Sequence, residues 1–342
     1  KMIISITLDQ QVGGIAQSLI NYSKALKKIN KTHLIILPDK AVIIKDLEDF
    51  SNVRLVKIPK ILLLFHLITK FVFDKNLENL LNSSKFIFIH NYKLVKYLSK
   101  FRNKVGLINH SGKARKPPNN IYNIFLTSAA KERFLKKYPS NRAKNIIIPH
   151  GFSNIRQRKK IIDRNDNFLN VVAAGRFVEK KGFEDLIEVA NILKKENINI
   201  KIKLYGEGPL DKVFKKKLKE LNLTNLSICK WASSSAEIFN GSNVFCIPSI
   251  KEPFGLIMGE AMMFGLPVIS TKTDGACELF GNHPEKKGGI IVNVSSPDEL
   301  VKAMIKLQNK KFREMISNNA RKNITNNFSI DILSSNLKKL LQ

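Results

Sequence analysis

Residues 248–261 read Pro248-Ser249-Ile250-Lys251-Glu252-Pro253-Phe254-Gly255-Leu256-Ile257-Met258-Gly259-Glu260-Ala261. The run just before them, Val244–Ile247, is short, apolar and β-prone, as a central parallel strand should be. Pro253 and Gly255 interrupt this run, and apolar residues then recur at helical spacing from Leu256 to Phe264. This order of strand, loop and helix predicts an open parallel α/β sheet, whose ligands bind beyond the carboxyl ends of the strands.

Two glutamates, Glu252 and Glu260, stand eight residues apart across this junction. The expected topology places Glu252 on the loop above the sheet edge and Glu260 one to two turns into the helix. Carboxylates accept hydrogen bonds from hydroxyls, in which sugars are rich. The N–H groups of Gly255 and Leu256 would face an anion such as phosphate. The junction is therefore typical of a site for a sugar joined to a phosphate, although exposed helical glutamates usually only keep a face solvated.

The pair Glu252 and Glu260, with Pro253-Phe254-Gly255 between them, resembles the signature of retaining glycosyltransferases of family 4, which have the GT-B fold. Further matching segments are spread over nearly the whole chain: Gly13-Gly14, Gly175-Arg176, Lys181-Gly182, Gly206-Glu207-Gly208-Pro209, and Thr273-Asp274-Gly275 followed by Glu278. The resemblance implies two Rossmann-like parallel-sheet α/β domains that face each other across a cleft.

The chain of 342 residues is long for one core and natural for two α/β domains. Helices are predicted between the strands, among them Gly14–Ile29 and Tyr92–Phe101. The strands are predicted at Met2–Leu8, His33–Leu37, Val53–Ile58, Phe86–His90, Val105–Asn109, Ile121–Leu126, Asn145–Ile148, Leu169–Ala174, Ile198–Tyr205, Asn225–Lys230, Val244–Ile247 and Pro267–Thr271.

The resemblance assigns a role to each part of the chain. Residues 1–155 are expected to form an acceptor-binding domain, and residues 168–328 a domain that binds the nucleotide sugar. A polar, basic linker is expected at 156–167. The segment 329–342 has the pattern of an amphipathic helix, which the resemblance predicts to pack back on the first domain.

Glycines and cations mark the other predicted ligand contacts. Gly13-Gly14 follows the first strand, so the backbone there can approach a phosphate closely, although a glycine pair alone is more often a plain turn. The dinucleotide pattern G-x-G-x-x-G is missing, which disfavours a dehydrogenase. Arg176 ends a strand and Lys181 precedes a helix, an arrangement that aims two cations into the crevice of Glu252. They would stabilise charge on a leaving nucleoside diphosphate, unless they are merely solvated surface cations.

His110 follows a predicted strand at the carboxyl edge of the first sheet. The resemblance places it near the donor sugar and the acceptor, where it can bond a hydroxyl or polarise the acceptor with a pKa suited to either role. A purely local structural role is the alternative. His90 also ends a strand, but a lining or structural role is favoured for it, and no chemistry is assigned to His150.

The resemblance also implies the mechanism. The catalytic residues are expected to be His110 and Glu252, with Glu252 bonding hydroxyls of the donor sugar and Glu260 bonding the ribose. The donor is expected to be a UDP-sugar, and the reaction a front-face displacement with retention. No metal or other cofactor is expected, because the sequence has no Asp-x-Asp pair and cationic side chains can replace the ion.

The formal net charge of +30 is unevenly distributed. Residues 1–165 hold 32 basic and 9 acidic side chains, and residues 166–342 hold 26 and 19. A codon bias toward lysine would spread the charge evenly, so the basic first half indicates an anionic partner.

The expected contacts for phosphates of a glycolipid such as lipid A–core are Lys113, Arg115 and Lys116, just after His110. The apolar stretch Pro59–Phe73 is expected either to touch an anionic membrane or to form a buried helix.

No apolar stretch is long enough to span a membrane, and we expect no signal peptide because Met2–Leu8 is predicted to run directly into a core strand. Cys229, Cys246 and Cys277 have no metal-ligand spacing and are expected to be small buried hydrophobes in a reducing compartment. We therefore expect a cytoplasmic protein that associates peripherally with the inner face of the cytoplasmic membrane.

Three alternatives to a transferase stay open. A nucleic-acid binder would explain the charge, but not the convergence of Glu252, Glu260, Arg176 and Lys181 on one crevice, and no nucleic-acid partner is expected. A sugar-nucleotide epimerase shares the two-domain architecture. A non-catalytic relative would keep the motifs only to bind its glycolipid.

Overall fold

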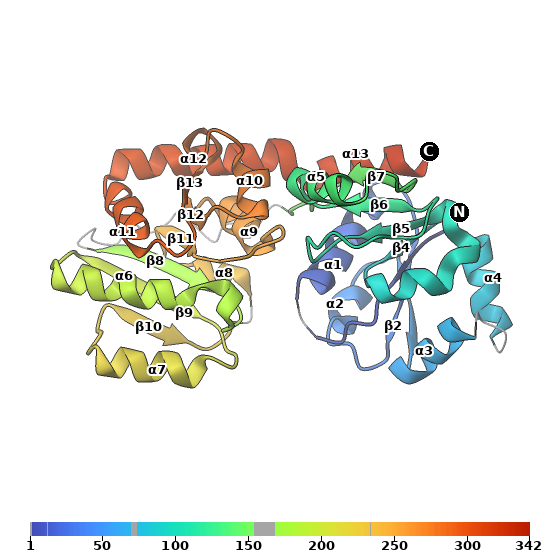
Figure 1. Cartoon of the computed structure of the whole chain (residues 1–342), viewed down its shortest axis with the longest axis horizontal. Coiled ribbons are helices and arrows are strands. Elements are labelled where there is room, and N and C mark those ends of the chain that lie inside the picture. The colour runs from blue at the N-terminus through green and yellow to red at the C-terminus, as the bar shows by residue number, and fades with distance from the viewer. Residues whose placement is uncertain (1, 12, 70–73, 154–167, 233) are drawn as a thin grey trace. The chain divides into compact units, whose positions relative to one another are not determined.

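The computed structural model describes residues 2–11, 13–69, 74–153, 168–232 and 234–342, which form two compact units (Figure 1). The first unit comprises Lys1–Gly151 and Phe328–Gln342, and the second comprises Phe152–Asn327. The predicted linker at 156–167 lies outside the described residues.

The first unit is built on a parallel sheet with the strand order β3-β2-β1-β4-β5-β6-β7. Strands β1 and β4 lie next to each other at its centre, and every residue in them is buried. Chain order reverses between these two strands, which is where ligands of such sheets bind. The strands are β1 (Ile3–Ile6), β2 (His33–Pro38), β3 (Val53–Ile58), β4 (Phe86–Ile89), β5 (Val105–Ile108), β6 (Tyr122–Phe125) and β7 (Lys144–Ile147).

Three helices of the first unit, α4, α5 and α13, begin at side chains that cap them, and α1 begins at a glycine. Asp74 accepts a hydrogen bond from the N–H of Leu77 at 2.9 Å, and Thr127 caps the next helix in the same way. The helical segments are α1 (Gly14–Lys28), α2 (Ile44–Glu48), α3 (Lys60–Ile68), α4 (Lys75–Ser83), the 3-10 segment η1 (Tyr92–Lys104), α5 (Ser128–Lys137) and α13 (Ile330–Leu341).

The C-terminal helix α13 belongs to the first unit and packs on α1 (Figure 1). The Ser334 hydroxyl donates to the carbonyl oxygen of Ala25 at 3.0 Å, and Lys28 forms an ion pair with Asp331. Gly151 also lies against this helix, because a Cβ there would stand 2.7 Å from the Cβ of Leu333. The last residues of the chain are therefore part of the first core.

The second unit has its own parallel sheet, with the strand order β10-β9-β8-β11-β12-β13. Its chain order reverses between β8 and β11, and β11 is buried throughout. The strands are β8 (Leu169–Ala174), β9 (Ile200–Tyr205), β10 (Leu226–Cys229), β11 (Val244–Ile247), β12 (Val268–Thr271) and β13 (Gly289–Val292). The helical segments are η2 (Glu179–Lys181), α6 (Phe183–Lys195), α7 (Asp211–Glu220), α8 (Ser235–Phe239), α9 (Leu256–Phe264), α10 (Asp274–Phe280), η3 (Glu285–Lys287), α11 (Pro297–Lys306) and α12 (Lys310–Phe328).

The prediction of two parallel-sheet α/β units is confirmed, but two local expectations were wrong. The helix expected at Tyr92–Phe101 is a 3-10 segment broken at Leu98. Like charges four residues apart, at Lys96 and Lys100, disfavour a regular α-helix in a segment that has no acidic side chain. The strand β13 was not predicted; it begins at the second of two adjacent glycines, Gly288 and Gly289, which are typical of a turn.

Candidate functional site

The loop after β1 leads into the N-terminus of α1 at the carboxyl edge of the first sheet. Gly13 is the N-cap of this helix and has an extended φ of 171°, which any residue can adopt. A Cβ at Gly13 would meet no described atom within 4 Å. The described fold therefore does not require a glycine at this position, and the open space lies beside Gly14 and the free N–H groups of the helix start.

Three histidines stack at the same edge of the sheet. The rings of His90 and His110 lie 5.2 Å apart and are inclined by 17°, and those of His110 and His150 lie 5.8 Å apart and are inclined by 21°. Nδ1 of His90 is 3.0 Å from Nε2 of His110, a hydrogen-bond distance. His90 and His150 are each 3% exposed, whereas His110 is half-buried. We call these three residues the histidine column.

The histidine column is neutral near pH 7. Burial lowers the pKa of His110 to about 4. Burial, and then repulsion from His110, hold the pKa values of His90 and His150 well below the usual value of 6.5. A ring with so low a pKa is a poor proton acceptor near pH 7, and its neutral form can still make hydrogen bonds. Sequence reasoning did not predict that the rings of His90 and His150 would stack on His110.

The basic loop after His110 keeps its cationic groups at the surface. Lys113, Arg115 and Lys116 are all exposed. The guanidinium of Arg115 lies 5.2 Å from the ring centre of Tyr92, whose hydroxyl donates to the carbonyl oxygen of Lys116 at 2.5 Å. The loop is thus held in place by a hydrogen bond to its backbone and by a cation–π contact with Tyr92. Its charged groups stay accessible to solvent.

In the second unit, the side chains of Lys181 and Glu252 are in contact. Lys181 lies after β8, and Glu252 lies after the neighbouring strand β11. Lys181 Nζ donates to Glu252 Oε2 at 2.5 Å, and the Ser249 hydroxyl oxygen is 3.5 Å from the same atom. The side chains of Lys181 and Glu252 are only 18% and 11% exposed. The structure therefore brings these two predicted site residues together at the carboxyl edge of β8 and β11, and it adds Ser249, which sequence reasoning missed.

Backbone contacts fix the loops that carry this pair. The N–H groups of Ile250 and Lys251 both donate to the carbonyl oxygen of Lys180, at 3.0 and 3.2 Å. Gly182 has a φ of +63°, and a Cβ there would stand 2.1 Å from the carbonyl oxygen of Pro248. No other residue fits so close to that carbonyl, which explains the glycine directly after Lys181.

Arg176 lies just beyond the end of β8 with an exposed side chain. Its own backbone is held by its neighbours, since the N–H of Phe177 donates to the carbonyl oxygen of Glu207 at 2.8 Å. Gly206 packs so closely that a Cβ there would stand 2.0 Å from the carbonyl oxygen of Gly175. The Arg176 side chain makes no hydrogen bond or ion pair with any residue that the structure describes, which leaves its guanidinium available to a ligand.

Helix α9 starts at Leu256 directly behind Glu252. Gly255, its N-cap, has a φ of +78°, and no side chain caps the helix. The N–H of Gly275 donates to the carbonyl oxygen of Glu252 at 3.0 Å and holds the loop against the start of α10. Glu260 lies on the second turn and is half-buried. The uncapped helix start offers N–H groups and a favourable dipole to an anion.

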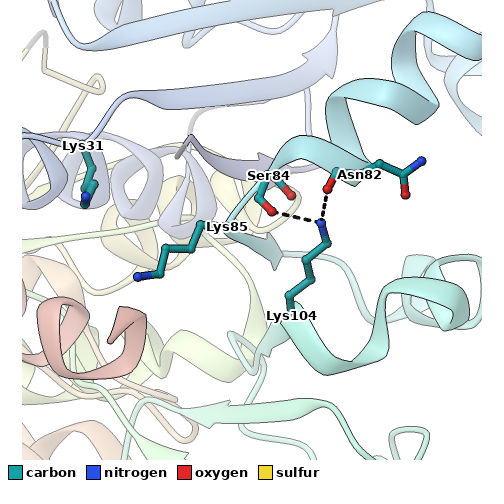
Figure 2. A pocket seen from close by; sticks show the side chains of 5 residues that line it. All are labelled: Lys31, Asn82, Ser84, Lys85 and Lys104. Atoms are coloured by element: carbon teal, nitrogen blue, oxygen red, sulfur yellow. Dashed lines mark hydrogen bonds between the residues drawn. The ribbon is translucent and has the colours of Figure 1, made fainter.

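A hollow of about 600 Å³ lies elsewhere, near the amino ends of the strands in the first unit. It is lined by Lys31, Asn82, Ser84, Lys85 and Lys104. Lys104 Nζ donates to the carbonyl oxygens of Asn82 and Ser84 at 2.8 and 2.9 Å (Figure 2). It also donates to the carbonyl oxygen of Leu81 at 2.8 Å, so it satisfies the end of α4. Lys104 thus serves as a helix cap, and the hollow is separate from the predicted site residues at the opposite strand ends.

Two other sequence expectations concern cysteines and metal ligands. Cys246 is buried, which raises the pKa of its thiol, but Cys277 is exposed, so the expectation that all three cysteines are buried was wrong. Cys277 lies on α10, where the surrounding apolar residues face the core and the thiol does not.

Among the described residues, no group of three or more His, Cys, Asp or Glu side chains could hold a metal ion.

A search of the described helices finds none that is both long and apolar enough to cross a membrane.

The second unit is similar in sequence to known glycosyltransferases. Residues 154–323 match the family Glycosyl transferases group 1. The capsular polysaccharide biosynthesis glycosyltransferase CapM of Staphylococcus aureus is 31% identical over 184 residues, which cover 52% of this chain and 46% of CapM. The UDP-Gal:alpha-D-GlcNAc-diphosphoundecaprenol alpha-1,3-galactosyltransferase of Escherichia coli is 25% identical over 177 residues, 51% and 45% of the two chains. The chain spans about half the length of the curated relatives it matches.

The fold of the whole chain has close counterparts among solved structures. Anabaena HepE in complex with UDP and glucose superposes with a TM-score of 0.78 at 16% identity, covering 99% of both chains. The two parallel-sheet units are therefore those of the GT-B glycosyltransferase fold. The match to the family Glycosyl transferases group 1, residues 154–323, falls on nearly all of the second unit.

Proposed function

We propose that the chain is a retaining glycosyltransferase of family 4 that moves a sugar from a nucleoside-diphosphate sugar, preferably a UDP-sugar, to a hydroxyl of an anionic envelope glycan or glycolipid. The observation that carries the proposal is the half-buried pair Lys181 and Glu252 beside the uncapped N-terminus of α9. A cation and helix N–H groups suit a diphosphate, and a carboxylate suits sugar hydroxyls.

The second unit takes the donor in this proposal. Arg176 and Lys181 hold the diphosphate and stabilise the charge that grows on it as the glycosidic bond breaks. Glu260 bonds the ribose, and Glu252 bonds the donor sugar. These cationic groups supply the stabilisation that a metal ion would otherwise give, so we propose that no metal is needed. The relative HepE was crystallised with UDP and glucose, which supports a UDP-sugar donor.

The first unit takes the acceptor. His110 donates a hydrogen bond at the reacting sugar, and Lys113, Arg115 and Lys116 bind phosphate groups of the acceptor. The Escherichia coli relative is named for an acceptor sugar carried on diphosphoundecaprenol, which supports an anionic glycolipid acceptor here. A glycolipid acceptor of the lipopolysaccharide-core type also carries phosphate groups, so the same cationic side chains would bind it.

The test of transfer uses the purified chain, a set of labelled UDP-, GDP- and ADP-sugars, and glycolipids extracted from bacterial membranes. We expect label from one UDP-sugar to enter the lipid fraction, and Arg176→Ala to reduce the rate by about 100-fold or more because it loses contacts to the leaving diphosphate. Conversion of the nucleotide sugar to its epimer without label in lipid would instead identify an epimerase. Binding of glycolipid without turnover of any donor would contradict the transferase proposal.

We further propose peripheral contact with the cytoplasmic face of an anionic membrane through α3. Four apolar side chains of this helix are exposed: Ile61 by 84%, Leu62 by 43%, Phe65 by 46% and Ile68 by 57%. They share a face, whereas Leu63 and Leu67 point into the core. The neighbouring segment η1 carries five basic and no acidic side chains, which would lie beside lipid head groups.

The membrane contact is tested by sedimentation with vesicles. We expect the chain to bind vesicles that contain phosphatidylglycerol and not vesicles of phosphatidylcholine alone. The double variant Ile61→Ser and Phe65→Ser should weaken binding at least tenfold, since each inserted side chain contributes about 1.5–3 kcal/mol. The matched control replaces Val213 and Met315, exposed apolar residues of the second unit, by Ser. Equal loss in both double variants would disprove a specific role of α3.

A further inference from the structure

The backbone of the histidine column is rigidly supported. The N–H of His90 donates to the carbonyl oxygen of Ile6 at 3.1 Å. The next residue, Asn91, accepts hydrogen bonds from the Thr7 hydroxyl at 3.1 Å and from the N–H of Leu8 at 2.7 Å. The loops after β1 and β4 are thereby joined, so the ring of His90 is held in a fixed place against His110.

The contact between the two imidazoles has only two possible arrangements of protons, because each neutral ring carries one N–H. If His110 donated from Nε2, His90 would accept at Nδ1 and carry its own proton on Nε2. That Nε2 atom is buried and has no hydrogen-bond partner among the described residues. A buried N–H without an acceptor is rarer in folded proteins than a buried acceptor without a donor.

The other arrangement avoids the unpaired N–H. His90 then carries its proton on Nδ1 and donates it to Nε2 of His110 across 3.0 Å. The neutral ring of His110 must in turn carry its proton on Nδ1. Stacking between His90 and His150 restricts rotation of this ring, so the assignment is stable against a flip.

We propose that His90 is a positioning residue that fixes His110 as the Nδ1–H tautomer, so that His110 meets the substrate as a hydrogen-bond donor and not as a general base. This inference rests on the proposed function for its catalytic consequence. Because Nε2 of His110 is occupied by the proton of His90, the ring has no free basic nitrogen. The proton of the acceptor hydroxyl must therefore leave by another route, which in a retaining front-face reaction is the leaving phosphate.

The direct test is the tautomer of His110, measured by nitrogen-15 and proton NMR of the full chain labelled at its six histidines. We expect protons on Nδ1 of both His90 and His110 in the wild type. His90→Leu should release His110 into a mixture of tautomers. His90→Asn, whose side-chain amide nitrogen can replace Nδ1 as the donor, should restore the Nδ1–H form. The control His150→Phe keeps a stacked ring and should leave the tautomer unchanged.

Kinetics give the second readout. His90→Leu should lower kcat by about 10- to 100-fold, the usual effect of removing a partner that orients a histidine, with KM for the donor within about threefold of wild type. His90→Asn should recover most of this loss. A proton on Nε2 of His110 in the wild type, or an unchanged tautomer in His90→Leu, would overturn the inference. Because the NMR result needs no turnover, it stands even if the chain proves not to be a transferase.

Discussion

Replacing Lys181 by Ala is expected to lower the rate of sugar transfer by about 100- to 1,000-fold, the typical effect of losing one preorganised group that stabilises charge in the transition state. Lys181 is half-buried, and its ammonium is held by Glu252 at 2.5 Å, so it needs little rearrangement to meet a diphosphate. Its loss also leaves Glu252 without its cation beside the donor sugar. Initial rates with saturating donor, measured together with the melting temperature, separate this effect from misfolding.

Lys180 provides a matched control for Lys181. It is the adjacent residue, has the same charge and is exposed. Its structural contribution is its carbonyl oxygen, which accepts from Ile250 and Lys251 and is retained in Lys180→Ala. We expect Lys180→Ala to transfer sugar at nearly the wild-type rate. Equal rate losses for the two variants would show that general positive charge, and not the pair with Glu252, accounts for the effect.

The first unit is expected to lose several kcal/mol of stability as the pH falls from about 7 to 5. Burial lowers the pKa of His33 to about 3 and that of His110 to about 4, and it holds those of His90 and His150 well below 6.5. The unfolded chain therefore binds protons that the folded chain does not, and stability falls with pH below about 6.5. Each histidine contributes up to about 1.4 kcal/mol per pH unit in this window.

Hydrogen exchange read by mass spectrometry resolves this effect by unit. Peptides from β4 and β5 should show a falling free energy of opening after correction for intrinsic exchange rates. Peptides from β8 and β11 serve as the internal control, because the second unit has a single histidine, His283, and it is exposed. A parallel fall in both units would mean that the buried histidines are not the cause. The buried ring of His33 has hydrogen-bond partners in the folded state, since both of its nitrogens lie 2.8 Å from serine hydroxyls.

The junction between strand β11 and helix α9 in the second unit was predicted correctly from local sequence signals. Pro253 and Gly255 end an apolar strand, and the structure begins α9 at Leu256 as predicted. Because ligands bind beyond the carboxyl ends of parallel strands, the sequence also predicted that Lys181 and Glu252 lie near each other, in the segments after the neighbouring strands β8 and β11. Ser249 was missed because a serine after a strand is too common to signal a site.

The histidine column could not be predicted, because it depends on contacts between distant segments. His90, His110 and His150 follow three different strands, and only the strand order and the backbone path bring their rings together. The spacing of these histidines in the sequence does not indicate that their rings are in contact. Their low pKa values likewise come from burial within the fold and not from neighbouring residues in the chain. The exposed face of α3 was also ambiguous, since its sequence is apolar all round and fits either a buried or an interfacial helix.

We propose that the second unit binds a nucleoside diphosphate at Arg176, Lys181 and the start of α9. The most direct test is the melting temperature of the purified chain with UDP, GDP or ADP, each also measured with Arg176→Ala. We predict that UDP stabilises the wild type, by about 2.7 kcal/mol at a concentration 100 times its Kd, and stabilises Arg176→Ala much less. Equal stabilisation of the two proteins by UDP, or no stabilisation by any of the nucleotides while the chain binds RNA tightly, would contradict the claim.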